Sequence, residues 1–210
     1  MGLRIRTIRR HPAMGVVELL VEGHRALRVG ADDAAGLEEG QEISSERLDG
    51  LKRAHELVHA LEMSYKFVRQ RPRSLKEIRV HLLKKGIDEG VVERALERLC
   101  AEGLADDEAF ARFWVGDREA FRPRGIYALR YELKQKGISR EISDRVLSAI
   151  DEKDSARRAA RSRLPALKRA SRREFERKMR SFLERRGFSF ETAREICEEL
   201  RSSVDSNDRN

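Results

Sequence analysis

The pattern with the most specific chemistry is His55-Glu56-Leu57-Val58-His59, which matches the H-E-x-x-H signature of zinc hydrolases. On a helix, histidines four residues apart lie on one face and can bind zinc, and the glutamate can act as general base. The chain continues without the extended form of this motif, and both histidines lie one step beside the apolar stripe of their helix. We therefore interpret His55 and His59 as residues at the edge of a packed helix. A zinc hydrolase that uses them with Glu56 is kept as a third hypothesis.

A second group of candidate ligands is Asp106-Asp107-Glu108. Consecutive residues on a helix point in different directions, so three adjacent acids do not form one metal coordination sphere. At the start of a helix they cap free N–H groups and offset the positive end of the helix dipole, which is the role we expect. Phe110, Phe113 and Trp114 follow at helical spacing and are interpreted as core anchors rather than base-stacking residues.

The remaining reactive residues do not indicate an enzyme. Cys100 and Cys197 are far apart and form no C-x-x-C, so neither a disulfide framework nor a cysteine zinc site organises the chain. Each is expected to be a small buried or half-buried side chain. The chain also has no G-x-x-x-x-G-K-[ST] loop, so any ATP chemistry would belong to a partner. We expect a non-enzymatic protein with no metal site and no cofactor.

Charge is the property that points to a partner. The chain has 210 residues and a formal net charge of +8, from 45 Lys+Arg and 37 Asp+Glu. Residues 1–50 carry a net −2 and residues 51–121 a net +1, whereas residues 122–210 carry +9. Within that last segment, residues 153–186 include 14 basic and 4 acidic side chains. This density predicts contact with a polyanion.

No apolar run is long enough to span a membrane, and no signal-like apolar stretch follows the first residues. We therefore expect a cytoplasmic protein without a membrane partner.

The hydrophobic pattern changes near residue 44. Before it, residues 3–8, 16–21 and 26–29 alternate, and residues 22–25 resemble a tight turn, which predicts a small antiparallel hairpin or three-stranded sheet. After it the period is helical. One stripe on one helix consists of Leu51, Ala54, Val58, Leu61, Tyr65 and Val68.

An internal repeat follows. Gly86, Gly137 and Gly187 are 51 and 50 residues apart, and each follows a similar helical segment. Glycine just past a helix supplies the left-handed conformation of a Schellman turn, in which the next residue packs back on the third-from-last helical residue. That pairing joins Ile87 to Leu82, Ile138 to Leu133 and Phe188 to Leu183. The helices that these turns end are expected to begin at capping boxes at Ser74 and Ser171, and at a weaker start at Gly125.

The predicted fold is therefore mainly α-helical, with tandem three-helix repeats in an elongated curved array after the N-terminal sheet. The predicted divisions are an N-terminal β region at 1–43, a connecting helix at 44–71, repeats at 72–121, 122–168 and 169–202 (the last incomplete), and a frayed tail at 203–210.

These residues carry a family resemblance. The segment from Ser74 to Ile87, the stretch Gly103-Leu104-Ala105-Asp106-Asp107-Glu108-Ala109-Phe110-Ala111, and Glu132 to Ile138 resemble the signature of the bacterial RecX family. The resemblance covers roughly residues 66–200. Ala105 departs from it, because the family more often has a bulkier apolar residue there.

The resemblance implies a non-enzymatic regulator of the RecA recombinase that lies in the groove of the RecA–DNA filament. Such a protein would inhibit strand exchange and ATP hydrolysis and promote filament shortening. We expect a monomer that contacts the filament and the DNA phosphate backbone. The alternative is a general architectural nucleic-acid-binding protein with no preference for RecA.

Charge density and helix placement select ten candidate contact residues, which we call the basic candidates. Reversing three of them, Arg157, Arg158 and Arg161, is expected to weaken filament binding without unfolding the protein. The full set is Arg130, Lys134, Lys136, Arg157, Arg158, Arg161, Arg172, Arg173, Lys178 and Arg180.

Overall fold

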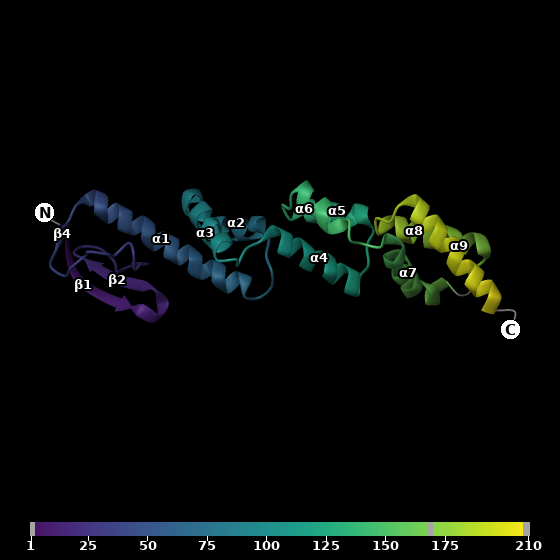
Figure 1. Ribbon diagram of the computed structural model, residues 1–210, viewed down its shortest axis with the longest axis horizontal. Helices are drawn as coiled ribbons and strands as arrows, with labels where there is room; N and C mark the ends of the chain where they lie inside the picture. The colour runs from purple at the N-terminus through teal and green to yellow at the C-terminus, as the bar shows by residue number, and fades with distance from the viewer. Residues whose placement is uncertain (1–2, 168–169, 208–210) are drawn as a thin grey trace. The chain divides into compact units, whose positions relative to one another are not determined.

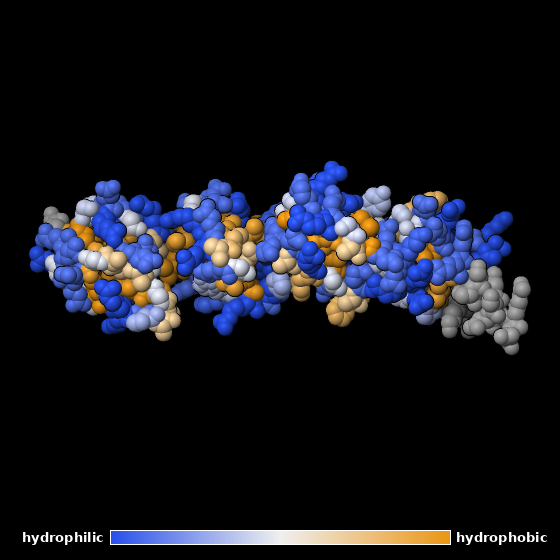
Figure 2. All heavy atoms as spheres, in the orientation of Figure 1, coloured by the Kyte–Doolittle hydropathy of each residue, from blue (hydrophilic) through white to orange (hydrophobic). Residues whose placement is uncertain are grey.

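The computed structural model describes residues 3–167 and 170–207, with side chains to residue 201. It divides into two compact units, one ending at Ala105 and the other beginning at Asp106. Both are largely helical, and a small antiparallel sheet precedes the helices, as predicted (Figure 1). Hydrophilic residues cover most of the face shown in Figure 2, with hydrophobic residues between them. No described helix is long and apolar enough to cross a lipid bilayer.

The first unit begins with four strands in the order β3-β2-β1-β4, all antiparallel. Three of them match the predicted alternating segments. The fourth, β4, has only two residues and pairs with the start of β1, so it is too short to leave an alternating pattern. The strands are β1 (Leu3–His11), β2 (Val16–Val21), β3 (Leu27–Gly30) and β4 (Glu42–Ile43).

One long helix, α1 (Ser45–Val68), connects the sheet to the first group of helices. Ser44 caps it by accepting the backbone N–H of Arg47 at 3.1 Å. Leu48, Leu51 and Ala54 pack in the sheet core, whereas the second half of α1, from Leu57 on, packs against α2 (Leu75–Lys84) and α3 (Glu89–Ala101). The single predicted stripe is thus divided between two cores.

The second unit contains two further groups of three helices, each around its own core. Together with the second half of α1, α2 and α3, they make three helical modules. We call these module 1 (α1–α3), module 2 (α4–α6) and module 3 (α7–α9). The helices of modules 2 and 3 are α4 (Asp107–Phe121), α5 (Ile126–Gln135), α6 (Arg140–Leu147), α7 (Glu152–Arg163), α8 (Arg172–Arg185) and α9 (Phe190–Asn207).

These modules differ in phase from the divisions drawn on the sequence. The predicted first repeat ends with the helix after Asp106, but Phe110, Ala111 and Val115 of that helix are buried with α5 and α6. Likewise α7 packs with α8 and α9, so the third group is a complete three-helix module. The glycine turn lies between the second and third helices of each module, and it therefore marks the period but not the boundary.

The Schellman turns form as predicted. Gly86, Gly137 and Gly187 have φ of 80°, 85° and 84°. In each turn the following residue donates its backbone N–H to the predicted leucine carbonyl: Ile87 to Leu82 at 3.3 Å, Ile138 to Leu133 at 3.0 Å and Phe188 to Leu183 at 3.2 Å. Both side chains of each pair belong to the same core.

The ends of other helices agree less closely. The Ser74 hydroxyl accepts the backbone N–H of Glu77 at 3.2 Å, but Ser171 makes no side-chain cap. The predicted frayed tail begins at residue 203, whereas α9 continues to Asn207. Residues 208–210 lie outside the described residues.

Modules 2 and 3 meet through backbone at the start of α5. Gly125 donates its N–H to the carbonyl of Arg186 at 3.0 Å. A Cβ at Gly125 would overlap the backbone of Gly187, and a Cβ at Gly187 would overlap Ala128. The Glu152 carboxylate strengthens this junction, because it accepts the N–H of Ile126 at 3.0 Å. Glycine at the predicted weak start of the helix is therefore required by close packing.

Candidate nucleoprotein interface

The basic candidates lie on three helices of the second unit. Arg130 and Lys134 are on α5, with Lys136 at its C-terminal cap, and the other seven are on α7 and α8. Six of the ten form an ion pair with a carboxylate: Arg130, Arg157, Arg158, Arg172, Lys178 and Arg180. The structure therefore divides the set into residues that stabilise the fold and residues whose charge faces solvent.

Two of the paired arginines join helices that are far apart in the sequence. Arg157 on α7 donates to both carboxylate oxygens of Glu199 on α9, at 2.8 and 3.0 Å. Arg158 reaches α4, where its Nη2 lies 2.5 Å from Glu119 Oε2 and its Nη1 contacts the Glu119 carbonyl. The Ser155 hydroxyl donates to the same Glu119 oxygen at 2.5 Å. Arg158 is thus part of the junction between modules 2 and 3.

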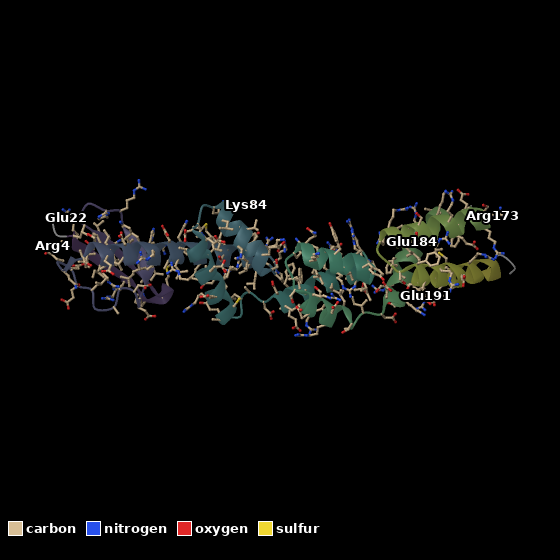
Figure 3. The ribbon with its side chains drawn as sticks, turned by 90° about the horizontal axis from the view of Figure 1, so that it is seen from above. Arg4, Glu22, Lys84, Arg173, Glu184 and Glu191 are labelled. Atoms are coloured by element: carbon tan, nitrogen blue, oxygen red, sulfur yellow. The ribbon has the colours of Figure 1, made fainter. Side chains whose placement is uncertain are left out.

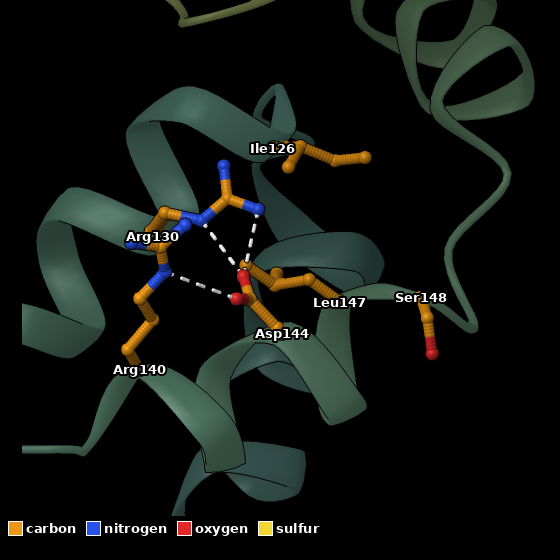
Figure 4. Close-up of a pocket in the computed structure, with 6 residues that line it drawn as sticks. All are labelled: Ile126, Arg130, Arg140, Asp144, Leu147 and Ser148. Carbon is orange, nitrogen blue, oxygen red and sulfur yellow. Dashed lines mark hydrogen bonds and ion pairs between the residues drawn. The ribbon is translucent and has the colours of Figure 1, made fainter.

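Arg130 lines a shallow pocket on module 2 (Figure 4). Its Nε and Nη2 lie 3.1 and 2.9 Å from Asp144 Oδ1, and Arg140 Nε lies 3.4 Å from Oδ2. The pKa of Asp144 is lowered, mainly by the hydrogen bond from Arg130. One carboxylate therefore holds two guanidinium groups at the surface.

A second internal carboxylate lies beneath Lys136. Glu132 Oε2 accepts Trp114 Nε1 at 2.7 Å and Arg118 Nε at 2.9 Å, while Oε1 pairs with Arg124 at 3.0 Å. The Lys136 ammonium lies 4.6 Å from the centre of the Trp114 ring. Lys136 is therefore held by a cation–π contact against module 2.

Three basic candidates, Lys134, Arg161 and Arg173, are exposed and have no carboxylate partner among the described residues. Arg173 lies at the N-terminal end of α8, opposite Glu184 at the other end (Figure 3). Two further exposed arginines, Arg163 and Arg177, share this property and were not among the candidates. Their signal in the sequence is the absence of an acid three or four residues away, which could supply a helical ion pair.

Exposed aromatic residues were also missed by the sequence analysis. Phe121, Tyr127, Tyr131 and Phe190 are between 62% and 79% exposed. Of the residues expected to anchor the core, Phe110 is buried and stacks with Trp114, but Phe113 is exposed. Phe113 lies one step off the buried face that Phe110 and Trp114 share.

The other candidate motifs have structural contacts. His55 Nδ1 accepts the backbone N–H of Arg28 on β3 at 2.9 Å, so the atom that a metal would use fixes α1 to the sheet. Asp106 caps α4 by accepting the N–H groups of Glu108 and Ala109, as predicted. Among the described residues no group of three His, Cys, Asp or Glu could hold a metal ion.

The cysteines differ from each other. Cys197 is buried in module 3, and burial raises the pKa of its thiol to about 11. Cys100 is exposed on α3, whereas a buried or half-buried side chain was expected there. Its position near the C-terminal end of α3 is turned away from the apolar stripe that includes Leu96 and Leu99.

Comparison with known families agrees with the modules that the structure defines. The models of the RecX first, second and third three-helix domains match residues 60–99, 106–147 and 151–197. The chain belongs to the RecX family. A regulatory protein RecX of Chlorobium phaeobacteroides is 37% identical over 67% of this chain and 93% of its own length. A regulatory protein RecX of a Mycobacterium species is 38% identical over 60% of this chain and 73% of its own length.

Two solved structures share the fold of this RecX chain. A crystal structure of a regulatory protein RecX superimposes with a TM-score of 0.77, covering 93% of this chain and 99% of that one at 22% identity. RecX from Lactobacillus salivarius has a TM-score of 0.64 over 70% of this chain and 98% of its own, at 20% identity.

An ion pair repeats between the second and third helices of the RecX modules. Arg79 pairs with Glu93 at 2.7 Å in module 1, and Arg130 pairs with Asp144 in module 2. Both pairs are 14 residues apart. The equivalent residues of module 3, 50 positions further on, are Arg180 and Arg194. Module 3 thus has two positive charges where the other modules have a neutral pair.

Proposed function

We propose that this RecX-family protein regulates the RecA recombinase by binding the RecA–DNA filament, and that it inhibits strand exchange and ATP hydrolysis without being an enzyme. The observation that carries the proposal is the tandem of three RecX domains between residues 60 and 197. Relatives that align over most of their length are named regulatory proteins. A filament on chromosomal DNA would place the protein in the cytoplasm, acting as a monomer.

Charge supports a nucleoprotein target. The basic excess belongs to residues 122–210, and the exposed arginines of α7 and α8 can meet DNA phosphate or an acidic filament surface. Arg161, Arg163, Arg173 and Arg177 are the contacts we favour, because their charge is not used within the fold.

The test is RecA's ATP hydrolysis on single-stranded DNA, with this protein titrated in below one molecule per RecA and RecA taken from the same organism. Inhibition at a substoichiometric ratio is expected, because a few molecules in the filament groove would block or shorten long filaments. No inhibition at stoichiometric excess, together with tight and salt-sensitive binding to bare DNA, would instead support the architectural nucleic-acid-binding protein.

A further inference from the structure

The outer face of α5 carries two exposed tyrosines. Tyr127 and Tyr131 are 67% and 65% exposed, and among the described residues neither hydroxyl has a hydrogen-bond partner. Residues four apart on a helix are neighbours on one face. Large aromatic side chains on the surface are most informative when they occur together, because single exposed apolar residues are common.

The fold does not use these rings. Leu129 and Leu133 of α5 are fully buried, and the helical angle of about 100° per residue puts Tyr127, Tyr131 and Lys134 together on the opposite side. The sister helices confirm that no aromatic side chain is required there. The positions equivalent to the two tyrosines are Lys76 and Val80 on α2, and Arg177 and Ser181 on α8.

The surroundings of the tyrosines are cationic. Residues 122–136 include five basic side chains and one acid, Glu132. Both carboxylate oxygens of Glu132 are engaged by Trp114, Arg118 and Arg124. Lys134 is exposed beside Tyr131, and Arg130 is exposed with its charge shared with Asp144. This surface therefore favours an anionic ligand that also offers flat apolar faces.

We propose that the α5 surface formed by Tyr127, Arg130, Tyr131 and Lys134 stacks against unpaired bases of single-stranded DNA, with the cations at its phosphates. Stacking of bases on aromatic side chains beside basic residues is how proteins hold single strands without reading their sequence. A helical rise of 1.5 Å per residue places the two rings about 6 Å apart along α5, so each can receive a different base. The inference deepens the proposed function, since it assigns a DNA form and a surface to the filament contact.

The experiment measures fluorescence anisotropy of the intact chain with a labelled thymidine oligonucleotide and with a duplex of equal length, at low salt. Each substitution, Tyr127→Ala or Tyr131→Ala, should weaken single-strand binding by about five-fold or more. Duplex binding should change by less than about two-fold, because stacked base pairs cannot present their faces to a side chain. Tyr127→Phe with Tyr131→Phe should retain single-strand binding, because stacking needs the ring and not the hydroxyl.

The matched control is Val80→Ala with Leu83→Ala, which removes two half-exposed apolar side chains from the same face of α2. It should leave single-strand binding unchanged. As a positional test, an oligonucleotide containing 5-iodouracil should photocrosslink to Tyr127 or Tyr131, and peptide mapping identifies the residue.

The proposal is overturned if the unmodified chain does not bind the oligonucleotide, or if the alanine variants bind it as the unmodified chain does. It is also overturned if single-strand and duplex binding fall equally, or if only binding to the RecA protein is lost, since the surface would then contact protein. RecA inhibition is measured separately with the unmodified chain. Its absence would reject the proposed function and leave the single-strand result standing.

Discussion

Gly125 lies directly against the backbone of Gly187, so that two glycines from different modules form the closest approach between α5 and the turn after α8. Gly125 has an ordinary φ of −71°, so its need for glycine is steric. Gly187 needs glycine twice, because its φ is +84° and its Cβ would also overlap Ala128. The relationship makes modules 2 and 3 a single packed body.

Replacing Gly125 with alanine should therefore loosen the second unit. We expect Gly125→Ala to lower the free energy of unfolding by about 1–3 kcal/mol, as overpacking of a tight contact does. Thermal and urea unfolding measure the change. The control is Gly116→Ala, in the middle of α4 with open space at its Cβ, which should stabilise the protein by up to about 1 kcal/mol. Equal stability of the two variants would show that the junction is not tightly packed.

The α7 arginines should separate into structural and binding residues. Arg158→Glu places a carboxylate beside Glu119 and Asp154, and we expect it to lower the free energy of unfolding by about 1–3 kcal/mol, since the pair is partly buried. The expectation that reversal of Arg157, Arg158 and Arg161 leaves the fold intact is revised accordingly.

In contrast, Arg161→Glu with Arg163→Glu should weaken filament binding and its salt dependence while the melting temperature stays the same. Calorimetry and a filament pull-down give the two readouts. Unchanged filament affinity in this double variant would exclude the end of α7 from the interface.

Asp144 should act as a brake on polyanion binding. Asp144→Asn removes the carboxylate that holds Arg130 and Arg140, so both become available to phosphate. We expect affinity for DNA to rise by about two- to five-fold, with a steeper salt dependence. Glu56→Gln, on the exposed face of α1, changes the net charge equally without releasing an arginine and should have a smaller effect. Equal effects of the two variants would mean that only net charge matters.

Stability should fall with pH near His81. Its ring stacks on Phe67 with a centroid distance of 4.2 Å, and the Arg73 guanidinium lies 3.8 Å from the centre of the same Phe67 ring. Burial, followed by the charges of Lys85 and Arg73, lowers the pKa of His81 below its usual 6.5. The unfolded chain therefore binds more protons in the range below about pH 6.5, so stability decreases as the pH falls through that range and is constant above it.

Urea unfolding between pH 5.5 and 7.5 measures this dependence for the unmodified chain and for His81→Phe, in which the slope should become smaller. The exposed His59 on α1 is the control, and His59→Gln should keep the original slope. A slope that His81→Phe leaves intact would assign the pH dependence to another group.

The two thiols should react at very different rates. At pH 8 the exposed Cys100 is expected to react quickly with a disulfide reagent, whereas Cys197 is buried and has a pKa raised to about 11. One thiol should therefore be titrated in the native protein and two in denaturant, and Cys100→Ser should leave none reactive in the native state. Rapid native reaction in Cys100→Ser would show that module 3 opens readily.

The parts of this structure that were predictable are local ones. The Gly86, Gly137 and Gly187 turns depend on residues within one helix and its cap, so their chemistry is readable in sequence. The phase of the modules is not local, because the contacts that assign α4 to α6 rather than α3 lie across the fold. The basic segment shows the same limit. Arg157 and Arg158 are neutralised by acids that lie 42 and 39 residues away, which no count within a window could reveal.

Helix α1 belongs to the sheet core through Leu51 and to module 1 through Ala60. Neither core can lose its half of that helix without exposing apolar surface in the other, since the hydrogen-bonded turns are continuous between them. Unfolding of the first unit should consequently occur in one step, with slow amide exchange reaching from β3 into α3. The N-terminal sheet then acts at a distance from any partner: it fixes the end of the rod on which the first regulatory module is built.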